Sequence, residues 1–337
     1  MNVLLAVDGG NSKTDLALIR EDGELLAFER GPMSSPHHIG LHGCLDILDR
    51  LYETAARAAG LDAGPRPLAD AGQVLLAGAD LPEEEQELAE AMGEHSFATD
   101  LVVGNDAFAV LRAGTERGWG VAVVCGAGIN CVGVAPDGRH ARFLSLGPIS
   151  GDWGGGYDLG LAGLGAAARA ADGRGPSTSL EAVVPAYFGF ATARDVAVAI
   201  HRGEMSSRRL VELAPVVLAE AESDPVAAGI LKRLADEIAL FAAAAVRQLA
   251  LTGDDVDVVL GGGVLRFGPA ELVDRVTAGV VEVAPRANVT VVSSPPVVGA
   301  ALLALDQIGA DETAKARARE ELDATVDGRL AMEAPDG

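Results

Sequence analysis

The first twenty residues constrain the fold of this chain more than any other stretch. The apolar run 3–7 predicts a buried strand, and Asp8 follows it directly into a polar turn with two glycines, 9–14. A second run, 15–19, predicts a strand that returns beside the first. Glycine amides can approach an anion closely, and a carboxylate at the strand end can hold a hydrated divalent cation. The turn therefore predicts a site for a metal-bound phosphate, with a simple hairpin turn as the alternative.

Length and composition narrow the class of protein. With 337 residues, 49% of them hydrophobic, the chain can form two domains with separate cores. The net charge of −23 argues against nucleic acid or an anionic membrane as a partner. We find no apolar run of transmembrane length and no secretory signal, so we expect a cytoplasmic protein.

The three cysteines, Cys44, Cys125 and Cys131, do not form CxxC pairs. Few and unpaired cysteines indicate neither a disulfide framework nor a zinc or iron–sulfur site. We expect three buried thiols.

The pattern of the first thirty residues occurs a second time. Residues 3–29 predict strand, glycine turn, strand, Asp-Gly turn and strand, and residues 119–146 repeat this order around a second glycine turn, 125–130. Helices are predicted at about 41–59, 82–93 and 108–113, and further strands at 73–79, 97–103, 255–260 and 289–292. This duplication predicts an α/β protein in which two glycine turns hold the phosphates of one nucleotide.

Two polar segments of the first half are candidate binding elements. Ser35, His37 and His38 are expected on a proline-containing loop; because a third metal ligand cannot be placed, the histidines are expected to contact solvent or a ligand. Asn105 and Asp106 follow a predicted strand and precede a helix, where a carboxylate can face a ligand or act as a helix N-cap. The acidic run 83–85 is interpreted as a solvated helix face.

Two glycine-rich segments of the second half are further candidates. In the loop 147–158, Gly151 and Asp152 suit a sugar, and Trp153 suits either a sugar ring or the core. Gly261, Gly262 and Gly263 end a predicted strand and suit either a flat ligand such as adenine or tight strand-to-helix packing.

Taken in order, five motifs resemble the BadF/BadG/BcrA/BcrD ATPase family over residues 2–308, and within it the N-acetylglucosamine kinase branch of the actin-like, sugar kinase and Hsp70 superfamily. They are Asp8-Gly-Gly-Asn-Ser-Lys-Thr14, Asn105-Asp106-Ala107, Cys125-Gly-Ala-Gly-Ile-Asn-Cys131, Gly151-Asp-Trp-Gly-Gly-Gly-Tyr157 and Leu260-Gly-Gly-Gly-Val264. The resemblance implies a two-domain, actin-like ATPase (ribonuclease H-like) fold of duplicated βββαβαβα topology, with ATP, Mg²⁺ and a sugar in the inter-domain cleft. It places the domains at 1–115, completed by a helix at about 296–310, and 116–295 with helical insertions. Residues 311–337 are expected to be a charged, partly disordered tail, with a helix followed by disorder.

The resemblance also implies roles for individual residues. Asp8 would hold Mg²⁺ through water, and Asp106 would be the catalytic base. ATP and its phosphates would be bound by Gly9, Gly10, Asn11, Ser12, Lys13, Thr14, Gly126, Ala127, Gly128, Asn130, Gly261, Gly262 and Gly263. The sugar would be bound by Ser35, His37, His38, Asn105, Asp106, Gly151, Asp152 and Trp153.

The implied function is transfer of the γ-phosphate of ATP to a hydroxyl, O6, of an amino sugar such as N-acetylglucosamine or glucosamine, by a homodimer. The alternative is an ATP-driven conformational switch, either an activator ATPase or a sugar-sensing regulator. Ser35, Leu146 and Trp153 depart from residues typical of the branch, which makes glucosamine or another hexose an alternative to the N-acetylated sugar.

Overall fold

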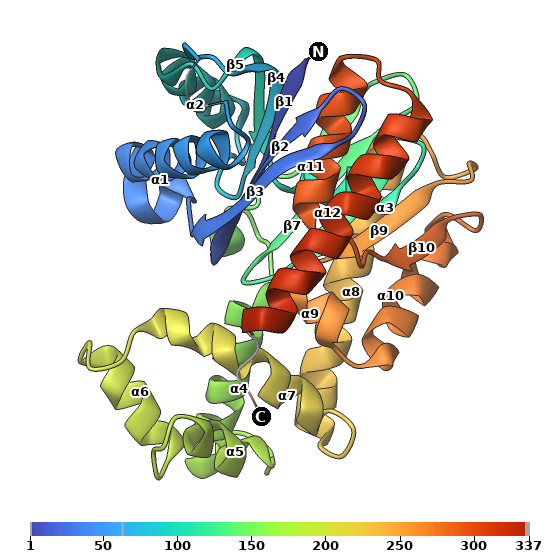
Figure 1. The fold of residues 1–337 in the computed structure, drawn as a ribbon. Helices are drawn as coiled ribbons and strands as arrows, with labels where there is room; N and C mark the ends of the chain where they lie inside the picture. The colour runs from blue at the N-terminus through green and yellow to red at the C-terminus, as the bar shows by residue number, and fades with distance from the viewer. Residues whose placement is uncertain (1, 62–63, 334–337) are drawn as a thin grey trace. The chain divides into compact units, whose positions relative to one another are not determined.

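The computed structural model describes residues 2–61 and 64–333, which form two compact units. Unit 1 consists of residues 1–119 together with 292–337, and unit 2 consists of residues 120–291. Figure 1 shows the elements of both units. The predicted boundaries, 115/116 and 295/296, lie four residues from those of the two units.

Unit 1 is built on a five-stranded sheet of order β3-β2-β1-β4-β5. The first three strands are antiparallel, as short turns allow, and β1, β4 and β5 are parallel. The strands are β1 Val3–Gly9, β2 Lys13–Arg20, β3 Leu25–Pro32, β4 Ala69–Leu76 and β5 Ala98–Asn105.

Helices cover both faces of this sheet (Figure 1). Side chains alternate along β1, so Leu5 and Val7 pack on one face with α1 (Pro36–Ala58) and α2 (Pro82–His95). Leu4 and Ala6 pack on the other face with α3 (Ala107–Gly114), α11 (Pro296–Gln307) and α12 (Glu312–Glu333). Each face therefore has its own hydrophobic core.

The C-terminal segment contributes to the second of these cores. Ala314, Ala318, Leu322 and Val326 recur every four residues on α12 and are buried. The expected helix of this charged segment therefore extends from residue 312 to residue 333, and its apolar residues as far as Val326 are packed on the sheet. The disorder predicted beyond it falls on residues 334–337, outside the described residues.

Unit 2 repeats the sheet of unit 1. Its strand order is β10-β9-β6-β7-β8, with β6, β7 and β8 antiparallel and β6, β9 and β10 parallel. The strands are β6 Gly120–Cys125, β7 Ile129–Val134, β8 His140–Arg142, β9 Asp257–Gly261 and β10 Asn288–Val291. The order and directions match those of β1 to β5, which confirms the predicted α/β class and its duplication.

The helices of unit 2 are mostly inserted between β8 and β9. They are η1 Gly147–Ile149, α4 Gly155–Ala171, α5 Leu180–Tyr187, α6 Ala193–His201, η2 Ser207–Leu213, α7 Ala214–Glu220 and α8 Pro225–Gln248, followed after β9 by α9 Gly263–Phe267 and α10 Ala270–Val283. Helix α8 begins where Asp224 accepts the amides of Val226 and Ala227, and it packs on β6 and β7. Over the described residues, every helix is too short or too polar to cross a lipid bilayer.

Candidate functional site

The carboxyl ends of three parallel strands place the candidate carboxylates of unit 1 on one sheet edge. In the sheet register Gly9 lies opposite Leu76, which lies opposite Asn105. The ladder continues one residue further, since Asp106 donates its amide to the carbonyl of Leu76 at 3.3 Å. Asp8 and Asp106 therefore lie at the edge where ligands of α/β sheets bind.

The first glycine turn joins β1 to β2 at this edge. The amide of Gly10 donates to the carbonyl of Lys13 at 2.9 Å and closes the turn. Asn11 and Ser12 are exposed at its tip, whereas Thr14 is fully buried. The hydroxyl of Thr14 donates to the carbonyl of Pro32 at 2.7 Å, so this side chain anchors the turn to the end of β3.

Three carboxylates make this region electronegative. Burial, and then the charges of Asp106 and Asp15, raise the pKa of Asp8 well above its usual range, while Lys13 and Arg30 oppose that rise. Asp15 is itself buried and accepts two bonds from Arg30, at 2.6 and 2.9 Å. A buried oxygen donor among like charges suits a hydrated divalent cation, so the donor set fits Mg²⁺ at Asp8.

Asp106 is a carboxylate with a raised pKa at the start of α3. It is partly buried, and its pKa is raised to about 7, mainly by burial and secondly by the nearby charge of Asp80. The backbone amides of Ala107 and of Asp106 itself lower this pKa, but by less. Although Asp106 is the N-cap residue of α3, its side chain makes no capping hydrogen bond. The Asn105 Oδ1 atom instead accepts the amide of Ala107 at 2.9 Å. The Asn105 side chain thus takes a hydrogen bond from the first residue of α3, and the Asp106 side chain caps none of the later amides.

Asn105 is fixed by two acidic residues that the sequence prediction missed. Its Nδ2 donates to Asp80 Oδ1 at 2.8 Å, and its amide donates to Glu85 Oε1 at 3.1 Å. The interpretation of 83–85 as a solvated face is therefore wrong for Glu85 and for Glu84, which are both partly buried and hydrogen bonded. The signal that could have identified Asp80 is its position just after a predicted strand, the same signal that identified Asp106.

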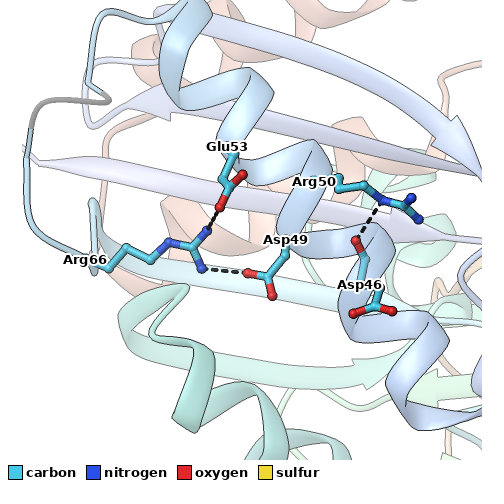
Figure 2. A pocket seen from close by; sticks show the side chains of 5 residues that line it. All are labelled: Asp46, Asp49, Arg50, Glu53 and Arg66. Carbon is cyan, nitrogen blue, oxygen red and sulfur yellow. Dashed lines mark hydrogen bonds and ion pairs between the residues drawn. The ribbon is translucent and has the colours of Figure 1, made fainter.

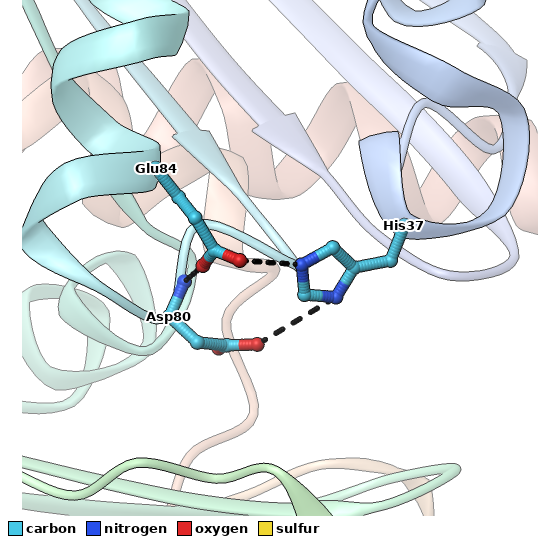
Figure 3. A group of neighbouring side chains, drawn as sticks. All are labelled: His37, Asp80 and Glu84. Carbon is cyan, nitrogen blue, oxygen red and sulfur yellow. Dashed lines mark hydrogen bonds and ion pairs between the residues drawn. The ribbon is translucent and has the colours of Figure 1, made fainter.

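The histidine pair lies on a helix, which corrects the predicted loop. Helix α1 begins at Pro36, because proline suits the first turn, and Gly40 with a φ of 73° kinks the helix before the amphipathic part starts. His37 Nε2 lies 2.9 Å from Glu84 Oε1, and its Nδ1 lies 3.9 Å from Asp80 Oδ2 (Figure 3). His38, on the same turn, is exposed.

Ser35, immediately before α1, is an unusual buried polar group. Its side chain is 1% exposed, and among the described residues its Oγ has no hydrogen-bond partner. Buried hydroxyls are nearly always paired. Ser35 therefore points to a bound group that supplies the partner.

The second glycine turn, at the end of β6, is docked on the start of α4. The amide of Gly126 donates to the carbonyl of Gly128 at 2.9 Å, and α4 returns two bonds, Gly156 N to Gly126 O at 2.8 Å and Tyr157 N to Ala127 O at 3.0 Å. Asn130, the first polar residue after the turn, accepts the amide of Cys131 at 2.7 Å. The turn is thereby held rigidly by unit 2.

The third glycine turn touches the same strand end. Gly261 ends β9, Gly262 has a φ of 91°, and Gly263 starts the short helix α9. A Cβ atom on Gly262 would lie 2.3 Å from the carbonyl oxygen of Cys125. Close packing thus requires glycine at Gly262, and it brings this turn beside the second glycine turn.

The loop before α4 holds the remaining candidates of unit 2. Gly151 has a φ of 85°, and Asp152 accepts a hydrogen bond from the Ser150 hydroxyl. The guanidinium of Arg233, from α8, lies 3.9 Å from the centre of the Trp153 ring. Trp153 therefore packs one face on the helical scaffold of unit 2.

A polar hollow on α1 lies among residues other than these candidates (Figure 2). Its lining is Asp46, Asp49, Arg50, Glu53 and Arg66. Arg66 pairs with Asp49 at 2.6 Å and with Glu53 at 3.2 Å, so these charges compensate one another. We assign no function to this hollow.

The chain is similar to a known family and to several known proteins over most of its length. Residues 5–304 match the model of the BadF/BadG/BcrA/BcrD ATPase family. The chain is 29% identical to an N-acetylmuramic acid/N-acetylglucosamine kinase from Clostridium acetobutylicum, over 79% of this chain and 86% of that protein. It is 26% identical to an N-acetyl-D-glucosamine kinase from Dictyostelium discoideum, over 90% and 98% of the two chains.

A solved structure shares the fold along nearly its whole length. It is that of a candidate N-acetylglucosamine kinase from Chromobacterium violaceum, with a TM-score of 0.71, 27% identity, and coverage of 90% of this chain and 99% of that chain. The family match spans most of the sequence and both units. This chain therefore belongs to the BadF/BadG/BcrA/BcrD ATPase family.

Proposed function

We propose that the chain is an ATP-dependent sugar kinase that transfers the γ-phosphate to a hydroxyl, O6, of an amino sugar such as N-acetylglucosamine or glucosamine. Two relatives that align with most of the chain are named as kinases of N-acetylated amino sugars. Their identity to this chain is below 30%, so the sugar itself has to be tested.

The observation that carries the proposal is the state of Asp106. A carboxylate with a pKa of about 7, placed at the end of β5 and not used for capping, can accept the proton of a sugar hydroxyl at neutral pH. Asn105 holds the backbone at this point, through Asp80 and Ala107, so the base would be positioned before the substrate arrives.

The phosphates of ATP are assigned to the glycine turns. In unit 1 the turn 9–14 would offer amides and the cationic Lys13, and in unit 2 the turn 126–130 would offer amides held by α4. Gly261, Gly262 and Gly263 are assigned to the adenosine. Asp8 would hold Mg²⁺ through water, and Mg²⁺ when bound would neutralise charge on the β- and γ-phosphates. These interactions place positive charge and N–H donors where negative charge develops during transfer.

The sugar is assigned to two groups of residues. They are Ser35, His37, His38, Asn105 and Asp106 in unit 1, and Gly151, Asp152 and Trp153 in unit 2. The buried hydroxyl of Ser35, which finds no hydrogen-bond partner in the part of the chain that the structure describes, supports a polar ligand near the start of α1. The net charge of −23 supports small-molecule substrates rather than nucleic acid. The homodimer is part of this proposal on the family resemblance alone.

The buried cysteines argue against an activator ATPase. An iron–sulfur cluster shared between subunits needs thiolates at the surface. Cys44, Cys125 and Cys131 are each 0% exposed and unpaired, as the sequence predicted, and burial raises the pKa of Cys44 and of Cys125 to about 12. They are therefore unsuited to hold such a cluster.

The proposal is tested by ADP release from Mg·ATP in the presence of glucosamine, N-acetylglucosamine, glucose, mannosamine or N-acetylmuramic acid. We expect strong stimulation by at least one amino sugar, and loss of that stimulation in Asp106→Asn. Asp100→Asn is a matched control, because Asp100 lies exposed on the same strand. If ATP binds and no sugar stimulates ADP release, the amino-sugar proposal is wrong.

A further inference from the structure

Three side chains from neighbouring segments of unit 1 form a cluster of metal-binding groups (Figure 3). His37 comes from the first turn of α1, Asp80 from the connection between β4 and α2, and Glu84 from the first turn of α2. One ligand atom of each lies within 4.8 Å of the other two. The sequence did not predict this cluster, because the two carboxylates lie more than forty positions from the histidine.

Each carboxylate of the cluster is oriented by the protein through one oxygen. Glu84 Oε2 accepts the amides of Asp80, at 3.0 Å, and of Leu81, at 2.9 Å, while Glu84 Oε1 faces the imidazole. Asp80 Oδ1 accepts Asn105 Nδ2 at 2.8 Å, while Asp80 Oδ2 faces His37 Nδ1 at 3.9 Å. Hydrogen bonds that fix a ligand in this way are a regular part of metal sites.

The unpaired hydroxyl of Ser35 lies beside the same imidazole. A Cβ atom on Gly78 would stand 3.0 Å from Ser35 Oγ and 3.2 Å from His37 Nδ1, so these two atoms are at most about 6 Å apart. That separation is spanned by one water molecule. A water bound to a cation beside Nδ1 would give Ser35 the partner that it lacks among the described residues.

We propose that His37, Asp80 and Glu84 bind a divalent transition-metal ion of the Zn²⁺ class. One imidazole and two carboxylates suit zinc and neutralise its charge, and they leave a fourth position for water. The imidazole disfavours Mg²⁺, which prefers oxygen ligands, so this site is distinct from the one assigned to Asp8. An ion binds only one nitrogen of an imidazole, so binding through Nδ1, which faces Asp80 Oδ2, requires Glu84 Oε1 to leave Nε2. Ligands of tetrahedral zinc stand about 3.4 Å apart, so groups that now lie within 4.8 Å of one another close by up to about 1.4 Å. His37 is exposed and Glu84 is partly buried, which leaves room for that movement.

His37 and Ser35 are shared with the proposed sugar site, so the test uses metal alone and its outcome does not depend on kinase activity. Full-length chain without an affinity tag is titrated with ZnCl₂ in the absence of nucleotide and sugar, by calorimetry and by equilibrium dialysis. We expect one ion per chain, and binding at least tenfold weaker in His37→Ala and in Glu84→Gln. Glutamine keeps an acceptor for the amides of Asp80 and Leu81 and removes only the charge, so the helix start is preserved.

Two matched controls separate this site from adventitious binding. His42→Ala and Glu83→Gln alter exposed groups on the same two helices, and both should bind zinc as the parent chain does. A Co²⁺-loaded parent chain should also show visible absorption bands of a low-coordinate nitrogen and oxygen site, and these should be absent from His37→Ala. No saturable binding, or equal binding by the parent chain and both cluster variants, would overturn the proposal.

Discussion

The titration of Asp106 predicts how turnover should depend on pH. Burial, and then the charge of Asp80, raise the pKa of this carboxyl to about 7. Only the ionised form can accept a proton, so about half of the molecules carry an active base at pH 7 and about a tenth at pH 6. We therefore expect kcat/KM to fall about fivefold from pH 7 to pH 6 and to rise about twofold from pH 7 to pH 8. Direct quantification of ADP avoids coupling enzymes with their own pH dependence.

Two variants test whether Asp106 causes this profile. Asp106→Asn should lose about 10²- to 10⁴-fold in turnover, and the residual activity should lack the inflection near pH 7. Asp80→Asn removes a charge that raises the pKa of Asp106, so its inflection should move to lower pH. A flat profile between pH 6 and pH 8 in the parent chain, or an inflection that persists in Asp106→Asn, would refute the assignment of the base.

Three further predictions concern stability. Arg30→Met removes two hydrogen bonds from the buried carboxylate of Asp15, which keeps its ion pair with Lys13 at 3.4 Å, and should lower the free energy of unfolding in urea by about 1.5–3 kcal/mol; an unchanged midpoint contradicts this. Folding raises the pKa of Asp106, so the parent chain should lose stability as pH rises from about 4 towards 7. The variant Asp106→Asn does not titrate, so its melting temperature should exceed that of the parent at pH 8 and equal it below pH 4. Gly262 and Gly189 both have a positive φ, so alanine strains the backbone at either position. Gly262→Ala should destabilise unit 2 more than Gly189→Ala, because only at Gly262 would the added Cβ clash with Cys125; equal losses would refute the packing argument.

The parts of the fold that depend on local patterns were predictable from the sequence. Apolar runs interrupted by glycine turns predicted β1, β2 and β6, and the recurrence of that order predicted the second sheet. The place of Asp106 between a strand and a helix was likewise predictable, and its role as a base stays a prediction. These signals all lie within about ten residues of the feature that they predict.

The contacts around the base were not predictable, because they join distant parts of the sequence. Asp80 and Asn105 are 25 positions apart, and His37 and Glu84 are 47 apart. A run of three glutamates predicts a charged helix face, but only tertiary packing determines that Glu84 and Glu85 turn towards neighbours. The helical start of α1 was missed because Pro36-His37-His38 lacks an apolar period, and the burial of Ser35 has no sequence signal at all.

The most direct test of the central claim is identification of the phosphorylated product. The chain is incubated with Mg·ATP and the most stimulating amino sugar, and ³¹P and ¹H NMR follow both reactants. The kinase assignment predicts one sugar phosphate for each ADP, with the phosphorus coupled to the protons on C6. Release of inorganic phosphate in place of a sugar phosphate would contradict it and would indicate an ATP-driven switch.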